Sequence, residues 1–234
     1  MRVQTGRARP RSCSSSLSSS PSALPGSSSG SCSRTAPAER SERASSELGF
    51  RPCGPEARAL AERVTRLENN SEYRYEVQAP LCLSLGEKAV YHYTKERRRH
   101  GHIVAIEELL LPLERPAPDG LVLFYKPSSL RRGTTTTLIS QVATGAWDAR
   151  PDDVVPLDIP IDLQQGNLIG ALAPAGASLY DLIDPKTLAQ LEPVADFGVL
   201  AVSCRGDDCA LTSASSRSPL DLARLWPVVR QLAG

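Results

Sequence analysis

Hydrophobic residues lie in short runs along this chain, and the spacing within the runs changes near residue 72. Before that point Leu60, Val64 and Leu67 recur at intervals of four and three residues. This spacing places all three on one face of a helix, so it predicts a short amphipathic helix over the segment EARALAERVTRLEN. Pro55 stands just before the segment, in the first-turn position that proline tolerates.

Beyond residue 72 the pattern is that of strands. Tyr73, Tyr75 and Val77 alternate with charged residues, which predicts a half-buried strand that ends at Pro80. Further short apolar runs, each bounded by Pro, Gly, Asp or Ser, occupy residues 89–94, 102–112, 120–127, 154–162, 168–174 and 197–204. The basic stretch KERRRHGH between the first two of these runs is interpreted as an exposed turn.

Helical patterns are sparse after the first helix. Residues 134–143 and 178–192 are candidates for short helices in the connections, and residues 218–233 give the clearest later helix. Ser218 is expected to cap that helix, and Pro227 to kink or end it. Seven or eight short strands, few helices and no βαβ alternation predict a mainly β fold, an antiparallel jelly-roll sandwich with a short N-terminal and a C-terminal helix.

The first 50 residues differ in composition from the rest of the chain. They contain 16 Ser, 7 Arg and 3 Glu and carry a net charge of +4, whereas the whole chain carries +1. Such a stretch without apolar clusters buries too little surface to offset its ordering entropy, so we expect it to be disordered. The expected organisation is a disordered arm over residues 1–54, a β body over residues 55–217 and a C-terminal helix or tail over residues 218–234.

Composition also argues against several classes of protein. No apolar run approaches the roughly 20 residues that span a bilayer, so no membrane span is expected. The head lacks the hydrophobic region of a secretory signal, and its Arg- and Ser-rich composition leaves an organellar transit peptide as an alternative. Six cysteines without a CxxC pair favour neither a disulfide scaffold nor a zinc site, and they indicate a reducing compartment.

Motifs for catalysis are sparse. The sequence contains no GxSxG, phosphate-binding loop, dinucleotide fingerprint or HExxH. The segment YHYT, followed by a strand ending in Pro, resembles the opening of ADP-ribosyltransferase toxins, which implies a set of His92, Tyr125 and Asp158. The Gly-rich segments of that family are missing, so a transferase-like secreted effector is kept as an alternative. We expect no catalytic residues, no cofactor, no metal and no small-molecule substrate.

Two polar segments allow more than one interpretation. Cys204 and Cys209 enclose Arg-Gly-Asp-Asp, which fits a hairpin turn, with a disulfide-closed integrin-binding loop as the alternative. Four acids are interpreted as residues that break the edge of a sheet, with calcium binding as the alternative: Asp152, Asp153, Asp158 and Asp162.

Positive charge is distributed along the chain rather than gathered in one site. It lies in the head, in the basic stretch at residues 95–99 and at Arg131 and Arg132, on an almost neutral body. Mobile arginines neutralise phosphates without reading sequence. The layout therefore favours nonspecific, salt-sensitive binding of nucleic acid.

The order of these features resembles that of coat proteins of small positive-strand RNA plant viruses, the bromovirus and cucumovirus family in particular. The segment RVTRLENN resembles the short helix after their basic arm, and residues 100–129 resemble their paired central strands. Residues 134–146 resemble their small-residue segment, and residues 178–208 are similar to their Tyr-Asp-Leu, apolar strand and Asp-Asp turn. The arm is less basic than the family usually shows, and the tail reads as a helix where the family continues in strand.

The resemblance implies a jelly-roll coat protein that assembles into a homo-oligomeric shell, binds single-stranded genomic RNA and resides in the virion and the host cytoplasm. The RNA-binding residues expected from charge and resemblance are Arg7, Arg9, Arg11, Arg34, Arg40, Arg43, Arg58, Arg63, Arg66, Arg97, Arg98 and Arg99. A plant virus movement protein that binds single-stranded RNA is the alternative, although the Asp usual in its central strands has no counterpart in residues 121–129.

Overall fold

The leading helix forms where the hydrophobic spacing predicts it. In the computed structural model, which describes residues 43–126, 150–163, 166–213 and 219–234, helix α2 spans Glu56–Glu68. It buries Leu60, Val64 and Leu67 and ends at Asn69, whose φ of 39° closes the helix in the left-handed conformation. The predicted N-terminal helix is confirmed.

In the part of the chain that the structure describes, seven strands form one antiparallel sheet. They are β1 (Arg51–Pro52), β2 (Arg74–Leu85), β3 (Lys88–Arg99), β4 (His102–Tyr125), β5 (Val155–Leu157), β6 (Leu168–Ala173) and β7 (Val199–Ser213). The order along the sheet is β1-β2-β3-β4-β6-β5, and β7 pairs with β4. All pairs are antiparallel, which confirms a mainly β, antiparallel fold.

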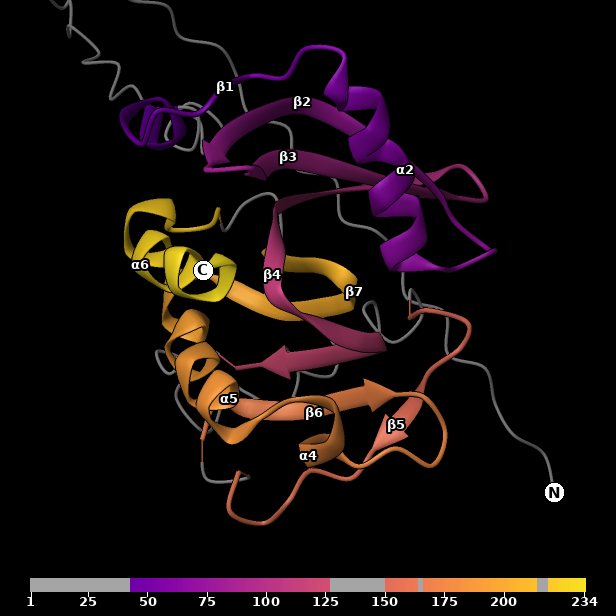
Figure 1. Ribbon diagram of the computed structural model, residues 1–234. Coiled ribbons are helices and arrows are strands. Elements are labelled where there is room, and N and C mark those ends of the chain that lie inside the picture. Colours follow the sequence, from indigo (N-terminus) through magenta and orange to yellow (C-terminus); the bar gives the residue numbers. More distant parts are fainter. Residues whose placement is uncertain (1–42, 127–149, 164–165, 214–218) are drawn as a thin grey trace, which may run out of the picture. The chain divides into compact units, whose positions relative to one another are not determined.

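Strands β4 and β7 bend together and divide the sheet into two halves. The first part of β4 pairs with β3 and its last residues pair with β6, while β7 follows β4 on both sides of the bend. The β4–β7 register shifts between Pro112 and Leu121, and Gly120 and Gly206 take positive φ values of 88° and 56° there. In Figure 1, β4 runs from the layer of β2 and β3 to the layer of β6 and β5.

The main hydrophobic core lies where the two halves face each other. Leu109 and Leu111 from the first half share one cluster with Leu121 and Leu123 from the second, although the four lie on the same strand. Helices from the C-terminal part complete this core. Two smaller clusters lie elsewhere, one beneath α2 and one around Val122. The bend therefore allows a single sheet to enclose its own core.

Among the described residues from 166 onward, four helical segments close the C-terminal part of the chain. They are α4 (Leu179–Leu182), α5 (Pro185–Leu191), the 3₁₀ helix η1 (Glu192–Phe197) and α6 (Leu222–Ala233). The helices predicted within residues 178–192 and near the C-terminus are thus confirmed. The main-chain N–H of Arg224 donates to Asp221, which caps α6. Pro227 does not end the helix, which continues to Ala233.

Four local predictions are wrong, and each places a turn or a strand end at residues that remain within a strand. The strand predicted to end at Pro80 is β2, which continues to Leu85. The basic stretch is not a turn before Arg99, because β3 runs through it and only His100 and Gly101 make the turn. The runs at residues 102–112 and 120–127 belong to one strand, β4. The expected hairpin turn at residues 205–208 lies inside β7, which bends at Gly206 but keeps its pairing to β4.

Several predictions fall on residues that the structure does not describe. Residues 1–42 of the arm expected over residues 1–54, the helix at residues 134–143, the pair Arg131 and Arg132, and the Ser218 cap lie outside the described residues. The rest of that arm is ordered rather than disordered: residues 43–47 are helical, Arg51–Pro52 form β1, and Phe50 packs into the main core. Within the described part of the chain, no helix is both long enough and apolar enough to span a membrane.

Candidate nucleic-acid interface

The start of β2, the end of β3 and the start of β4 extend together beyond the C-terminal end of helix α2 (Figure 1). There Tyr75 pairs with Arg97, Arg97 with Val104, and Arg99 with His102. Successive side chains of a strand point to opposite faces, so these residues share the face that α2 covers farther along the same strands. We call this surface the outer face. It comprises the exposed His102 and Val104 and four half-buried residues, Tyr73, Tyr75, Arg97 and Arg99.

Arginine and tyrosine side chains contact each other across the outer face. The guanidinium carbons of Arg97 and Arg99 lie 5.5 and 5.3 Å from the centroid of the Tyr73 ring. The Tyr75 ring lies 6.3 Å from the Tyr73 ring, and the Lys95 ammonium lies 5.8 Å from the centroid of the Tyr75 ring. The distances from Arg97, Arg99 and Lys95 to these rings are in the range of cation–π contacts. Aromatic rings and guanidinium planes are the surfaces on which unpaired bases stack, without regard to sequence.

Strand alternation separates the three consecutive arginines of the basic stretch. Arg98 points away from the outer face and pairs with Glu76 at 3.0 Å and Glu96 at 2.9 Å. Arg99 also pairs with Glu72, at 2.6 Å. Arg97 and Arg99 therefore belong to the outer face, and Arg98 does not.

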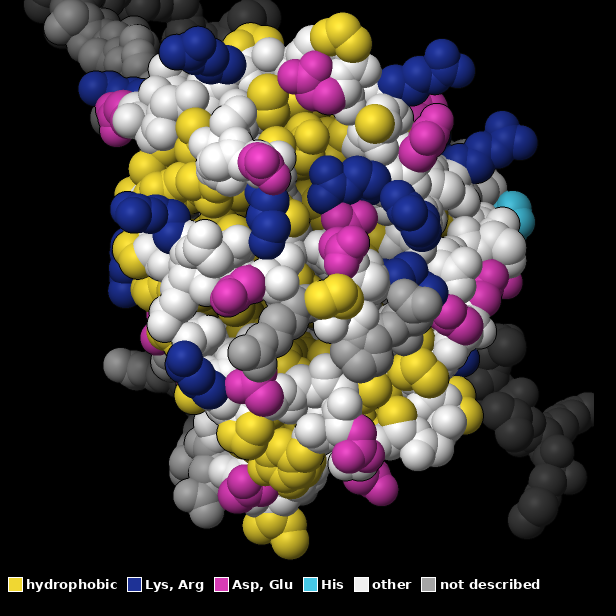
Figure 2. All heavy atoms as spheres, viewed as in Figure 1, with side chains coloured by type: hydrophobic (Ala, Val, Ile, Leu, Met, Phe, Trp, Pro, Cys, Tyr) yellow, Lys and Arg dark blue, Asp and Glu magenta, His cyan; other side chains and the backbone are white. Residues whose placement is uncertain are grey.

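Nearby glutamates offset most of the positive charge at this end of the sheet. Four arginines, at positions 74, 97, 98 and 99, stand among the three glutamates at positions 72, 76 and 96. A cavity of about 530 Å³, lined in part by Arg74 and Arg98, lies at the tip of the strands. Figure 2 shows basic and acidic side chains interspersed on the visible face rather than one continuous basic field. Binding here would depend on stacking more than on net charge.

A buried ion cluster supports the outer face from the side of α2. The Lys95 ammonium pairs with Glu68, the last residue of α2, and lies 2.6 Å from Glu108 of β4. The Tyr93 hydroxyl donates to Glu108 at 2.9 Å, and so does the Thr212 hydroxyl at 2.8 Å. Lys95 and Glu108 are 4% and 0% exposed. The cluster fixes the end of the helix to the sheet.

Burial and the neighbouring charges determine the pKa values of Glu68, Lys95 and Tyr93 in this cluster. Burial raises the pKa of the Glu68 carboxyl. Burial opposes the charge on Lys95, but Glu108 and Glu68 outweigh it and raise the pKa of that ammonium. Burial and the neighbouring Glu108 carboxylate also raise the pKa of the Tyr93 hydroxyl well above its usual range. Lys95 therefore has a structural role, because its buried ammonium is paired with Glu68 and Glu108 and does not face solvent.

The arginines of helix α2 differ in their surroundings. Arg63 donates two hydrogen bonds to Asp208 of β7 through Nε, at 3.1 and 3.2 Å, and packs 5.2 Å from the Tyr91 ring. It ties the helix to the sheet. Arg58 and Arg66 are exposed. Arg43 is also exposed and pairs with Glu47 at 3.1 Å. The remaining expected residues, Arg7, Arg9, Arg11, Arg34 and Arg40, lie outside the described residues.

The residues of the transferase alternative are not gathered in an open site. His92 is 6% exposed, and its Nδ1 and Nε2 lie 2.8 Å from the Ser45 hydroxyl and 2.6 Å from the Glu107 carboxylate. Tyr125 is buried in the main core, whereas Asp158 is exposed. No contact described among these residues joins them to one another.

Sequence reasoning missed the Ser45–His92–Glu107 arrangement. Its members are 47 and 15 residues apart and belong to no local motif. Ser45 is 0% exposed, so no substrate reaches its hydroxyl in this conformation. Glu107 also accepts a hydrogen bond from the main-chain N–H of Leu220 at 2.7 Å. The arrangement joins the segment before β1, the sheet and the segment before α6, which is a structural role.

Two of the four acids considered for calcium, Asp152 and Asp153, have separate protein partners. Asp152 accepts a hydrogen bond from the main-chain N–H of Ser71, at 2.9 Å. Asp153 accepts two from Arg205, at 2.8 and 2.9 Å, and these lower the pKa of its carboxyl. Among the described residues, no group of three or more His, Cys, Asp or Glu side chains is placed to hold a metal ion.

Comparison of the chain with protein-family models, with curated proteins and with solved structures gave no match.

Proposed function

We propose that this chain is a structural protein that binds single-stranded RNA and packs against copies of itself, as the coat subunit of a viral shell. The observation that carries the proposal is the outer face, where Arg97 and Arg99 stack on Tyr73 beside Tyr75. Arginine and tyrosine in this arrangement suit unpaired bases and phosphates together.

Two further features support the proposal of a viral coat protein. The body is a mainly β, antiparallel fold whose sheet bends over its own core. We propose that this bent sheet is a form of the jelly-roll sandwich of viral coats. The arm supplies additional cations at Arg7, Arg9, Arg11, Arg34 and Arg40, which add a nonspecific electrostatic contribution to RNA binding.

Fluorescence anisotropy with a labelled single-stranded RNA tests the outer face. At about 0.3 M salt, where electrostatic binding is weak, Tyr73→Ala is expected to weaken binding by about 5- to 150-fold, the loss of roughly 1–3 kcal/mol per stacked base. Tyr180→Ala is the matched control, because Tyr180 is an exposed tyrosine of α4, 41% accessible, away from the outer face. Equal affinity of both variants would rule out the outer face as the interface.

Deletion of residues 1–42 tests the contribution of the arm. The shortened chain is expected to bind RNA with a smaller salt dependence, because each lost phosphate contact reduces the slope of log affinity against log salt by about 0.7. Arg230→Gln is the charge control, since Arg230 is exposed on the last turn of α6. An unchanged slope would show that the arm does not contact RNA.

Electron microscopy of the full chain mixed with RNA tests self-assembly. Closed particles of uniform size are expected. Filaments or irregular RNA–protein complexes would refute the shell and favour a movement protein, while a monomer without RNA affinity would refute the whole proposal.

A further inference from the structure

Two cysteines of β7 lie side by side because the strand bends between them. Cys204 and Cys209 are five residues apart, which in a straight strand would separate them by about 16 Å. Their Sγ atoms are instead 3.3 Å apart. Gly206, with a φ of 56°, lies between them at the bend. Cys204 pairs with Leu121 and Cys209 with Leu111, so the two thiols stand on opposite halves of the sheet.

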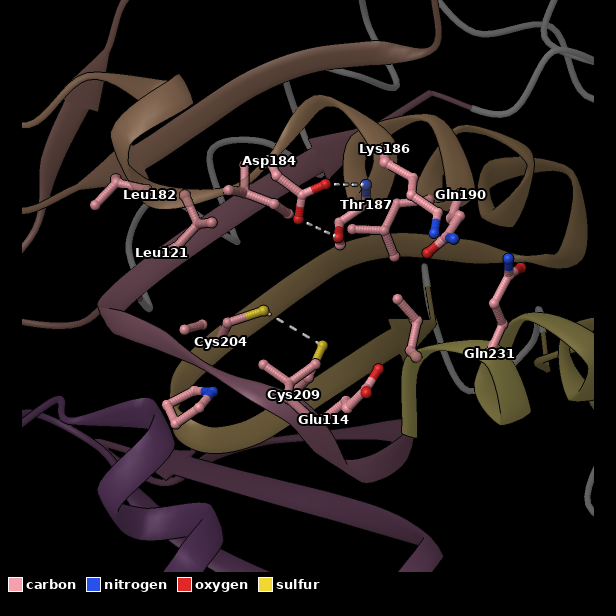
Figure 3. Close-up of a pocket in the computed structure, with 16 residues that line it drawn as sticks. Glu114, Leu121, Leu182, Asp184, Lys186, Thr187, Gln190, Cys204, Cys209 and Gln231 are labelled. Atoms are coloured by element: carbon pink, nitrogen blue, oxygen red, sulfur yellow. Dashed lines mark hydrogen bonds between the residues drawn. The ribbon is translucent and has the colours of Figure 1, made fainter. Parts of the chain in front are cut away.

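Both thiols line a cavity. The cavity has a volume of about 450 Å³ and lies between the bend of β4 and β7, the α4–α5 segment and α6. Figure 3 shows the two sulfur atoms turned toward each other, with Lys186 and Gln190 of α5 and Gln231 of α6 around the same space. Its volume is in the range of pockets that admit small molecules. The thiols are therefore buried from bulk solvent, at 4% and 1% exposed, but adjoin a space that a small reagent can occupy.

We propose that Cys204 and Cys209 are a modification site, at which a small-molecule disulfide entering this cavity oxidises the two thiols to a reversible intramolecular disulfide. A disulfide bond is about 2.05 Å long, so the sulfur atoms approach by little more than 1 Å from their present separation. The inference is independent of RNA binding.

The thiol–disulfide exchange proceeds in two steps. The thiolate of Cys204 attacks one sulfur of the reagent, forms a mixed disulfide and releases one reagent thiolate, which takes up a proton. Cys209 then gives up its proton, attacks the Cys204 sulfur and displaces the second reagent thiolate. In total the protein loses two electrons and two protons, and the reagent gains both to become two thiols.

The order of attack follows from the surroundings of the two thiols. The hydrogen bond with Cys204, burial and the nearby Asp208 together raise the pKa of the Cys209 thiol well above its usual range. Cys209 therefore keeps its proton at rest, and Cys204, the more accessible of the two, is assigned the first attack. The resulting bond joins the two halves of the sheet at the bend.

A second cysteine pair provides an internal comparison. Cys53 and Cys82 are both half-buried, and burial and a hydrogen bond with Cys82 raise the pKa of Cys53 to about 12. They lie outside the cavity at the bend. Any oxidation experiment must therefore identify which cysteines are joined.

Peptide mapping of the full chain makes this identification directly. Trypsin cleaves after Arg205, between the two cysteines, so a Cys204–Cys209 bond links the separate peptides 187–205 and 206–217. The native protein is equilibrated with mixtures of reduced and oxidised glutathione, its free thiols are alkylated, and the digest is analysed by mass spectrometry without reduction. The linked pair is expected to appear as the oxidised fraction rises and to disappear after dithiothreitol.

Variants and a denatured sample complete the test. Cys82→Ser is expected to retain the linked pair, and Cys204→Ser to lose it and to leave Cys209 open to alkylation after unfolding. Native protein is expected to form the linkage at a lower oxidised fraction than protein in urea, because the fold holds the thiols together. Full alkylation of both cysteines at the most oxidising mixture, or glutathione retained on Cys204 without a linked pair, would overturn the proposal.

Discussion

Replacement of Lys95 by methionine tests whether the buried ion cluster supports the fold. The substitution keeps the length of the side chain but removes the cation that Glu68 and Glu108 share. All three groups are buried, with side-chain exposures of 4%, 11% and 0%. Breaking a buried pair by removing one partner costs about 3–5 kcal/mol, so we expect the free energy of unfolding at pH 7 to fall by that amount.

The pH dependence of this loss gives a second, independent readout. Burial raises the folded-state pKa of Glu68, and loss of the Lys95 ammonium, which lowers it, raises that pKa further above the unfolded value of about 4.3. Groups with a raised folded-state pKa favour the folded state at low pH and lose that contribution as the pH rises. The deficit of the variant is therefore expected to shrink between pH 7 and pH 5, by up to about 1.4 kcal/mol per pH unit.

Urea unfolding followed by circular dichroism measures both effects. With a slope of about 2 kcal/mol per molar, the expected loss lowers the midpoint by about 1.5–2.5 M. Lys186→Met is the matched control, since Lys186 is exposed and should change stability by less than about 0.5 kcal/mol. Adding Glu108→Gln to Lys95→Met removes one buried charge and should restore part of the stability. A loss below about 1 kcal/mol, or the same loss at pH 5 and pH 7, would refute the reasoning.

Two further predictions concern alkaline pH and backbone conformation. Burial raises the pKa of Tyr93 and Tyr125, so their contribution to stability is present below about pH 10 and is lost above it; absorbance at 295 nm should rise together with loss of circular dichroism, and full ionisation of a native fold would contradict this. Gly198→Ala should lower the free energy of unfolding by about 1–3 kcal/mol, because φ is 90° and the added methyl would lie 3.0 Å from the Pro219 carbonyl oxygen. Gly176→Ala, at φ 83° with open space around it, isolates the cost of the backbone conformation, and an equal loss in both variants in calorimetry would exclude the steric contribution.

The parts of the fold that sequence predicted correctly are those set by local periodicity. Leu60, Val64 and Leu67 lie on one helical face whatever they pack against, so α2 was predictable. The alternation around Tyr73 and Tyr75 likewise predicted the first part of β2, although β2 continues through Pro80, its predicted end, to Leu85. The bend of β4 was not predictable, because the Pro- and Gly-containing segment before Gly120 has the composition of a loop. Pairing with β7 keeps that segment in the sheet.

The candidate surfaces depended on contacts between distant residues, and here the sequence was less informative. It identified Arg97, Arg98 and Arg99 as one basic group, but a strand in place of the expected turn directs Arg98 to the opposite face. The partner of Arg63 is 145 residues away along the chain. The sequence between Cys204 and Cys209 predicts a hairpin turn, but these residues lie in β7, and the bend of that strand brings the two thiols together.

The contacts on the outer face determine how stacking and charge can be separated in RNA binding. In the free protein the Tyr73 ring holds the guanidinium groups of Arg97 and Arg99, and Glu72 pairs with Arg99. Removal of the ring takes away a stacking surface but releases the guanidinium of Arg97 toward phosphates, whereas Arg99 stays paired with Glu72. The first change weakens binding at every salt concentration, whereas the second strengthens it only where screening is weak. A stacking role for Tyr73 therefore requires that Tyr73→Ala lose most affinity at high salt and show a steeper salt dependence than the native chain, while a purely structural role would leave the slope unchanged.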